Sequence, residues 1–409
     1  MSPSLYERLR EEAHAMSGEI IGWRRALHRH PELSFKEVET TRFIVEKLRE
    51  FGYEDIQTGF GPIETGAMTS IGKGERCVAL RGDIDALPVE EKTGLDYASE
   101  RPGVMHACGH DAHTANLLAV AKLLRMHEAQ LKGRVKLIFQ PAEETRVKIF
   151  EKPLSGAGYV VRSGAVDDVD AIFGMHVWSP FEKGKLFIKA GPTMMASGRF
   201  SLEVVGKSTH GASPHEGIDP ITTACRIVDG IQTIVSREVD PREPRLITVG
   251  TIHGGTATNI VPESVTLSGT LRAARESVVR FMGERLGEVA RGIAEASRCS
   301  TNYKLLINGP AVVNDPAMVE VVRKAARAVL GADRVCDVQK LPGSEDFREY
   351  SARIPAALYF MGMRTDDPES GRPHHSPQFC VNDEVLADSA AVMAATAMTY
   401  LSEHCGAAG

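Results

Sequence analysis

Short apolar strands that alternate with helical segments are the feature that most restricts the fold of this chain. Cys77–Gly82 (CVALRG), Val135–Gln140 (VKLIFQ) and Ala171–His176 (AIFGMH) have the composition of buried strands, and residues 111–131 have helical spacing. Further elements are expected as helices over 4–28, 38–51, 316–330 and 384–403, and as a strand over 356–361. This alternation predicts an α/β fold with a largely parallel central sheet flanked by helices.

A second pattern begins near residue 190, where the Gly- and Pro-containing stretch 189–197 is typical of a linker. The order that follows is β-α-β-β-α, close to a ferredoxin-like split βαβ unit. Its expected strands cover 199–206, 246–252 and 265–271, and its expected helices cover 219–237 and 276–297. The α/β pattern resumes around 301–308. We therefore expect one large domain made of residues 1–192 and 304–409, and an inserted α+β domain over residues 193–303.

Charge and cysteine content restrict the class of partner. A length of 409 residues fits about two domains, and a net charge of −6 provides no basic field for nucleic acid. We expect no membrane partner, because no run approaches the roughly 20 apolar residues of a membrane helix. The charged N-terminus lacks the apolar run of a signal peptide, which favours a cytoplasmic protein. The seven cysteines are widely spaced without CxxC, so reduced thiols are expected.

Side chains that bind metals and move protons gather near the ends of the predicted strands. In α/β folds this edge of the sheet is where ligand sites form. Five segments carry them: Arg81–Pro88 (RGDIDALP) with Asp83 and Asp85, His106–His113 (HACGHDAH) with Cys108 and His110, Pro141–Glu144 (PAEE), Gly174–Trp178 (GMHVW) with His176, and Pro373–Phe379 (PHHSPQF) with His374 and His375. Each alone has an ordinary structural reading, such as a cap, a solvated surface or a core histidine. Together they predict a metal site.

The residue types suit a hydrolytic metal site. Cys108 and His110 can face one ion if the chain between them is extended, and a thiolate with an imidazole suits zinc or another borderline metal. One of the adjacent glutamates can bind a metal while the other serves as general base. Adjacent His374 and His375 point apart in extended chain, so at most one is an easy ligand. A bound divalent ion lowers the pKa of a water molecule and polarises a carbonyl group.

The order RGDIDALP, CGHDAH, FQPAEE, GMHVW and HHSP resembles the M20 family of metallopeptidases and amidohydrolases. The segments LHRHPELSFKE (27–37), GKSTHGASPHEGIDP (206–220) and GGTATNIVPE (254–263) resemble its branch of hippurate hydrolases, N-acyl-amino-acid amidohydrolases and auxin-conjugate hydrolases. The resemblance spans nearly the whole chain. It implies that the large domain is catalytic and that the inserted domain is a lid that also forms a homodimer.

The resemblance also implies roles for individual residues. Two divalent metal ions per subunit would be bound by Cys108, His110, Glu144, His176 and His375. Glu143 would be the general base and acid, and His210 would stabilise the oxyanion. Asn259 and Arg272 would bind the substrate carboxylate, and Asp83 and Asp85 would shape the site without binding metal. Manganese or zinc is expected, with nickel or cobalt as alternatives.

The expected activity is hydrolysis of the amide C–N bond of a small N-acyl or N-aroyl amino acid. One departure from the family pattern affects the substrate: after PAEE the chain continues as TRVKIFEKPLSGA (145–157), roughly eight residues longer than the usual Gly-rich turn. This insertion is either a neutral surface loop or a change to the substrate pocket. The second possibility leaves open a hydrolytic deaminase of a small aromatic amine. A non-catalytic binding protein is a third alternative, and Glu143 argues against it.

Overall fold

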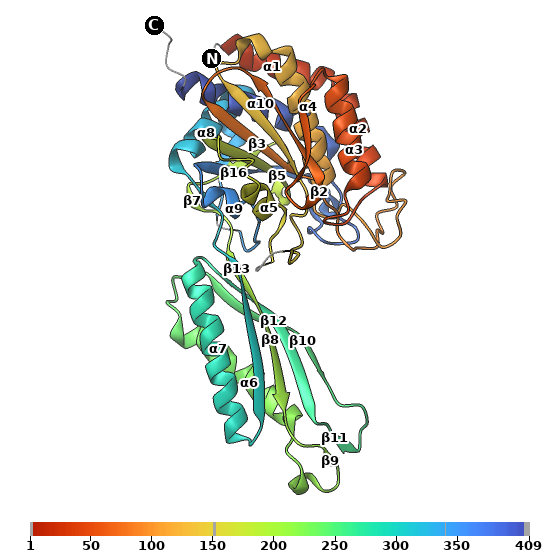
Figure 1. Cartoon of the computed structure of the whole chain (residues 1–409), viewed down its shortest axis with the longest axis vertical. Helices are drawn as coiled ribbons and strands as arrows, with labels where there is room; N and C mark the ends of the chain where they lie inside the picture. Colours follow the sequence, from red (N-terminus) through yellow and green to blue (C-terminus); the bar gives the residue numbers. More distant parts are fainter. Residues whose placement is uncertain (1–2, 150–152, 340, 405–409) are drawn as a thin grey trace. The chain divides into compact units, whose positions relative to one another are not determined.

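The computed structural model describes residues 3–149, 153–339 and 341–404, and Figure 1 shows the whole chain. Phe150 of the insertion and Cys405 lie outside the described residues. The chain divides into two compact units. Unit 1 comprises residues 1–191, 313–339 and 346–409, and unit 2 comprises residues 192–312 and 340–345.

Unit 1 contains an eight-stranded mixed sheet with the order β1-β2-β4-β3-β5-β16-β6-β15. Its centre is parallel: β3 pairs with both β4 and β5, and β5 pairs with β16. The strands are β1 (Ile56–Phe60), β2 (Ile63–Gly72), β3 (Cys77–Asp83), β4 (Arg134–Gln140), β5 (Ala171–Glu182), β6 (Leu186–Ile188), β15 (Val335–Asp337) and β16 (Ala356–Arg364). The expected α/β class with a largely parallel central sheet is confirmed.

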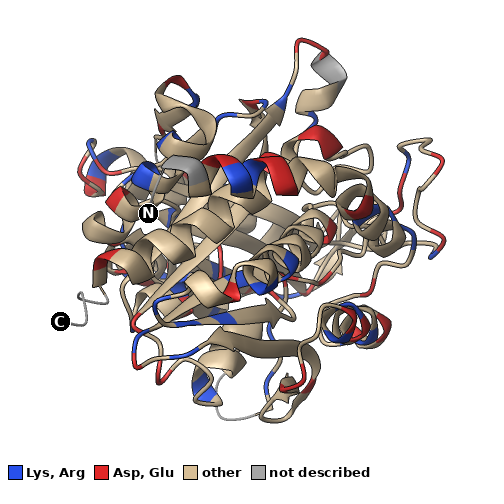
Figure 2. Cartoon of the chain, turned by 90° about the horizontal axis from the view of Figure 1, so that it is seen from above, with Lys and Arg blue, Asp and Glu red and all other residues tan. Residues whose placement is uncertain are grey.

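Helices flank this sheet, and the most apolar of them form its core. The helices are α1 (Pro3–Ala15), α2 (Ser17–Arg29), α3 (Val38–Glu50), α4 (His110–Met126), α5 (Gly156–Arg162), α8 (Pro316–Leu330), α9 (Arg348–Ser351) and α10 (Leu386–His404). α4 and α10 contact β3, and α1, α2 and α8 pack around them. Figure 2 shows acidic and basic residues interspersed along the outer helices, whereas the central strands are mostly uncharged.

One apolar segment qualifies the expectation about membranes. Asp383–His404, which contains α10, is long and apolar enough by length and composition to cross a membrane. However, 94% of its apolar window is buried inside the fold, as in the core helix of a soluble protein. The segment is therefore weak evidence for a membrane span.

Local signals explain where several helices begin and end. The Asp315 carboxylate accepts hydrogen bonds from the backbone N–H groups of Ala317 and Met318, and Pro316 occupies the first turn of α8. α8 stops at Gly331, whose φ of 98° is unfavourable for other residues. Residues 4–28, predicted as one helix, form α1 and α2 with a break at Met16. The helix predicted over 111–131 corresponds to α4, which ends earlier than predicted, at Met126.

Unit 2 is a four-stranded antiparallel sheet with the order β10-β12-β8-β13 and with α6 and α7 packed on it. Its elements are β8 (Ala196–Val205), β9 (Thr209–His210), α6 (Pro220–Thr233), β10 (Arg245–Gly254), β11 (Ile260–Val261), β12 (Ser264–Ala273), α7 (Glu276–Ala296) and β13 (Ser300–Gly309). Residues 301–308, predicted to return to the large domain, instead belong to β13 and pair with β8. The first segment of unit 2 therefore ends at Val312, nine residues beyond the predicted boundary at 303.

Candidate metal centre

A sharp turn into α4 presents Cys108 and His110 together. Gly109 between them has a φ of 88°, and a Cβ at this position would lie 2.6 Å from Cγ2 of Val177. Glycine is therefore needed both for the backbone conformation and for the close packing. Nδ1 of His110 donates a hydrogen bond of 3.1 Å to Oδ1 of Asp85, which leaves Nε2 as the free ligand atom.

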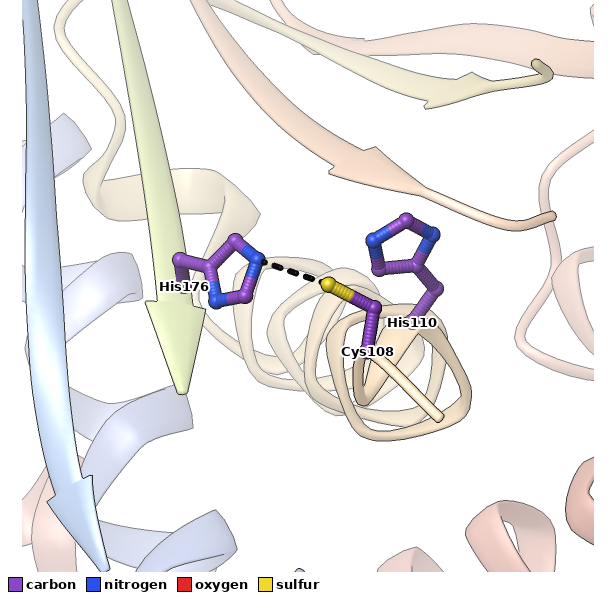
Figure 3. A group of neighbouring side chains, drawn as sticks. All are labelled: Cys108, His110 and His176. Carbon is purple, nitrogen blue, oxygen red and sulfur yellow. Dashed lines mark hydrogen bonds between the residues drawn. The ribbon is translucent and has the colours of Figure 1, made fainter. Parts of the chain in front are cut away.

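His176 approaches Cys108 from β5, and Figure 3 shows the two side chains directed toward one another. Nε2 of His176 lies 3.6 Å from Sγ of Cys108. Nδ1 of His176 donates to the carbonyl oxygen of Val177 at 2.6 Å, which makes Nε2 the unprotonated nitrogen. His176 was predicted to end its strand, but β5 continues to Glu182 and His176 lies in its middle. The strand extends because residues as far as Trp178 pair in register with β16.

The two glutamates after β4 are fixed through their backbone. The N–H groups of Glu143 and Glu144 donate to the two carboxylate oxygens of Asp85, each at 3.1 Å. Ala142, at a φ of 51°, donates its N–H to Oε1 of Glu37 at 2.8 Å. Burial, together with the charge of Asp85, raises the pKa of Glu37 to about 7. Asp85 thus orients His110 and both glutamates.

The structure distinguishes the two adjacent histidines. His374 is half-buried, its Nε2 accepts the N–H of Ser179 at 3.2 Å, and its ring stacks on Trp178. His375 has a φ of 66°, and its Nε2 lies 3.1 Å from Oε1 of Glu144. That contact lacks the orientation of a hydrogen bond, since Oε1 of Glu144 is buried without a hydrogen-bond partner. His375 is therefore the histidine placed beside Glu144.

The predicted ligands fall into overlapping groups whose ligand atoms all lie within 4.8 Å of one another. One group is Cys108, His110 and His176; a second is Cys108, Glu144 and His375; a third is His110, Glu143 and Glu144. The five side chains expected to bind metal are thus brought together with Glu143, and Cys108 belongs to two groups. Asp83, His110 and His113 form another group, but Nδ1 of His113 donates to Asp83 and its Nε2 accepts the N–H of Val177.

The electrostatics of the centre fit a bound cation. Burial alone lowers the pKa of His110, but the carboxylates of Asp83, Asp85 and Glu144 outweigh it and raise the pKa to about 10. Burial and the charges of Glu144 and Glu143 raise the pKa of the Cys108 thiol well above its usual value. A thiolate at Cys108 therefore requires a compensating positive charge. Nε2 of His110 and Oε1 of Glu144, buried without hydrogen-bond partners, are suitable donors for a divalent ion.

A buried polar network lies behind the metal centre, and its role was not predicted from the sequence. The Arg81 guanidinium donates to Asp83 at 2.8 Å and to Asp346 at 2.9 Å. Asp346 also accepts hydrogen bonds from the Gln140 amide and from the N–H of Ala157, both at 3.0 Å. The N–H of Asp346 donates to Oε1 of Glu143 at 3.0 Å. The available sequence signal was an arginine at the end of an apolar run, two and four residues before Asp83 and Asp85.

The other predicted site residues belong to unit 2. His210 and Asn259 lie near one another, since β9 pairs with β11 and the Gly211 N–H donates to the Asn259 carbonyl oxygen. Nδ1 of the exposed His210 accepts the N–H of Ala212 at 3.1 Å, which makes Nε2 the protonated nitrogen. Arg272 lies half-buried on β12, opposite Ser197 of β8.

The described parts of the 145–157 insertion form a loop that closes on itself. Val147 and Leu154 exchange two backbone hydrogen bonds of 3.0 Å, and the Gly156 N–H donates to the Ala142 carbonyl oxygen at 2.8 Å. The Tyr159 hydroxyl donates to the Val147 carbonyl oxygen at 3.0 Å. Val147 and Ile149 also line a surface groove that includes residues of α3.

Comparison with known proteins identifies the class to which this fold and metal centre belong. The profile of peptidase family M20/M25/M40 matches residues 79–399, and the chain belongs to this family. An N-acetyl-L-cysteine deacetylase of Bacillus subtilis is 40% identical over 371 residues, covering 90% of this chain and 85% of that protein. An IAA-amino acid hydrolase of Arabidopsis thaliana is 37% identical, covering 94% of this chain and 86% of that protein.

A solved structure extends the similarity to the fold. A dinuclear metal-binding peptidase of the M20 family from Bacillus subtilis has a TM-score of 0.79 and 33% sequence identity, covering 95% of this chain and 99% of that one. The chain is therefore a metal-dependent amidohydrolase of the M20 family. The candidate ligand groups and this dinuclear relative support two divalent metal ions.

Proposed function

We propose that this enzyme hydrolyses the amide bond of a small N-acyl or N-aroyl amino acid, with Glu143 as general base and acid. The observation that carries the proposal is the convergence of Cys108, His110, Glu144, His176 and His375 beside Glu143. The names of the deacetylase and the IAA-amino acid hydrolase supply the class of substrate. We propose those five side chains as the metal ligands.

Glu143 and Glu144 differ in their surroundings, which supports different roles for them. When bound, the divalent ions supply a Lewis acid and lower the pKa of water. One oxygen of Glu143 accepts the Asp346 N–H, so the carboxylate is held in one orientation. Its other oxygen can take a proton from water and return it to the leaving amide nitrogen. Oε1 of Glu144 lies beside His375 and is kept for metal binding.

We assign the remaining chemistry of the reaction to unit 2. His210 exposes a protonated Nε2, the donor needed to stabilise the oxyanion that develops on the amide carbonyl oxygen. Exposed Asn259 and the guanidinium of Arg272 supply hydrogen-bond donors suited to the substrate carboxylate. Unit 2 is proposed as a lid and as the homodimer interface. Its edge strand β10 carries an exposed Ile252, which supports pairing with a second copy.

Metal identity and cellular location complete the proposal. Carboxylate and imidazole ligands suit manganese, whereas Cys108 favours zinc, nickel or cobalt. We propose a cytoplasmic enzyme without nucleic-acid or membrane partners. The six described cysteines are all free thiols, which fits a reducing compartment.

A hydrolysis screen of the metal-reconstituted enzyme tests the function. Manganese and zinc are loaded in parallel, and the panel holds N-acetyl, N-benzoyl and indole-acyl amino acids with several aminobenzoic acids. Free amino acid and ammonia are measured separately. Release of free amino acid that EDTA abolishes is the expected result. Ammonia released only from the aromatic amines contradicts the proposal and supports the deaminase.

A variant of the base tests the non-catalytic alternative. Glu143→Ala is expected to lose turnover by roughly 10²- to 10⁴-fold while retaining its metal. Metal content is measured on the same sample by mass spectrometry. A Glu143→Ala enzyme with unchanged turnover would remove Glu143 from the mechanism.

A further inference from the structure

Two arginines share the face of the unit 2 sheet that is turned away from its helices. Along β8, Phe200, Leu202 and Val204 pack into the core of unit 2, so Arg199 points to the opposite face. Along β12, Leu271 and Ala273 belong to the same core, so Arg272 also points to the opposite face. The alternation of side chains therefore places both guanidinium groups on the open face.

The register of the strands makes these arginines neighbours. Arg199 lies opposite Thr270, and Arg272 lies opposite Ser197, so the two are a diagonal pair across adjacent antiparallel strands. Diagonal neighbours in such a pair lie about 7–8 Å apart, within reach of long side chains. The charge of Arg199, after burial, contributes to lowering the pKa of Arg272, as expected for adjacent cations.

Neither arginine has an acidic partner among the described residues of unit 2. Nη1 of Arg272 is shielded from solvent without a hydrogen bond, and a shielded polar group without a partner costs free energy. The acidic residue on the same face of β8, Glu203, is four positions from Arg199, about 13 Å along the strand, and accepts a hydrogen bond from Asn302. The positions that surround the pair on this face are uncharged or basic: Ser197, Ser201, Leu246, Thr248, Thr270, Lys304 and Leu306.

We propose that Arg199 and Arg272 form a subsite for a dicarboxylate, so that the preferred substrates are N-acyl derivatives of the acidic amino acids. This inference rests on the proposed function, in which Arg272 binds the α-carboxylate present in every N-acyl amino acid. Arg199 then binds the second carboxylate, that of a glutamate or aspartate side chain. A guanidinium pairs with a carboxylate through two parallel hydrogen bonds, and the subsite offers one such pair to each carboxylate.

Isosteric substrates test this specificity. We compare kcat/KM for N-acetyl-glutamate with N-acetyl-glutamine, and for N-acetyl-aspartate with N-acetyl-asparagine, in the metal-loaded enzyme. The acidic substrate is expected to be favoured by roughly tenfold or more, because a charged hydrogen-bond pair is lost with the amide. Arg199→Gln should reduce this ratio to about threefold or less. Arg291→Gln, which removes an exposed cation on α7, on the other face of the sheet, should leave the ratio unchanged.

A binding measurement separates failure of the inference from failure of the proposed function. Isothermal titration of the unmutated protein and of Arg199→Gln with L-glutamate and L-glutamine requires no turnover. Binding of glutamate that is tighter than that of glutamine and is weakened by Arg199→Gln supports the subsite, even if no amide is hydrolysed. If the ratio of kcat/KM for the acidic substrate to that for its amide is the same in the wild-type enzyme and in Arg199→Gln, while amides are still hydrolysed, the subsite is overturned and the proposed function stands. Equal binding of the two amino acids likewise overturns it.

Discussion

The backbone N–H of Asp346 donates a hydrogen bond of 3.0 Å to Oε1 of Glu143, and so joins residues from distant parts of the sequence. The carboxylate of Asp346 is in turn fixed by Arg81, Gln140 and the N–H of Ala157. The orientation of the proposed base therefore depends on the buried ion pair between Arg81 and Asp346.

Asp346→Asn is expected to lower kcat about 10- to 100-fold with little change in KM or bound metal. The replacement puts an N–H₂ group among existing donors, so the Asp346 backbone shifts and Glu143 loses its fixed orientation. Steady-state kinetics with metal analysis measure this. Tyr350→Phe is the control, because it removes the 3.0 Å hydrogen bond to Gln140 but leaves the Asp346 carboxylate in place, and it should retain kcat. An unaltered kcat in Asp346→Asn would refute the positioning role.

The two adjacent histidines should respond differently to substitution. His375→Ala is expected to lower the bound metal from two ions toward one per chain, because His375 belongs to the group with Cys108 and Glu144. His374→Ala should lower the thermal midpoint instead, since it removes a half-buried ring stacked on Trp178 and the partner of the Ser179 N–H. Metal analysis and thermal unfolding on both variants decide the assignment. A loss of metal confined to His374→Ala would reverse it.

Replacement of Cys108 should weaken the binding of both metal ions, since its Sγ belongs to two ligand groups. Cys108→Ala is expected to weaken the binding of both ions by at least ~10-fold, whereas His176→Ala weakens one. Competition with a chelator measures the two affinities. Cys77→Ala, at another buried free thiol of unit 1, is the matched control and should keep both ions. Selective loss of a single ion from Cys108→Ala would mean that the sulfur is not shared.

The lowered pKa of Asp388 predicts that the protein loses stability in acid. The pKa of Asp388 is below its ordinary value of 3.8: burial raises it, but hydrogen bonds from Arg10 and His14 and the charge of Arg334 outweigh burial. A depressed carboxyl pKa stabilises the fold above the unfolded value and ceases to do so as the pH falls through the folded value. Asp388→Asn should therefore cost about 1–3 kcal/mol at pH 7, and less below pH ~3.8.

Urea unfolding at several pH values measures this difference. Asp337→Asn provides the comparison, because Asp337 is an exposed residue paired with Arg323 and such surface pairs contribute little. A constant difference between Asp388→Asn and the native protein from pH 7 to pH 3 would contradict the assignment.

Local patterns predicted β3, β4, β5 and β16, the central strands of the unit 1 sheet, because these strands are continuous apolar runs; β1, β2, β6 and β15 were not predicted. The strand Val135–Gln140 and the ligand-bearing turn at Cys108 are both visible in a few adjacent residues. The middle position of His176 in β5 was not visible, because the strand continues only where β16 provides a partner. β13 was misassigned for the same reason, since pairing with β8 is a tertiary contact.

The candidate site shows the same limit. Convergence of the ligand segments could be expected, since they follow strands of one parallel sheet. The contact of Asp346 with Glu143 could not, because it depends on a backbone N–H that every residue but proline possesses. Residue spacing alone left the choice between His374 and His375 open, and the family resemblance favoured His375. The structure places His375, at a positive φ, beside Glu144.

Because the 145–157 loop is closed at its base, the positions of Glu143 and Glu144 do not depend on the length of the loop. Val147 pairs with Leu154, and Gly156 is hydrogen-bonded to Ala142, in a position where a Cβ would meet the Pro141 carbonyl oxygen at 1.5 Å. The chain enters and leaves the loop at fixed points. The backbone hydrogen bonds that hold Glu143 and Glu144 to Asp85 lie outside this closed segment, so a change of loop length between Val147 and Leu154 should leave both glutamates in place.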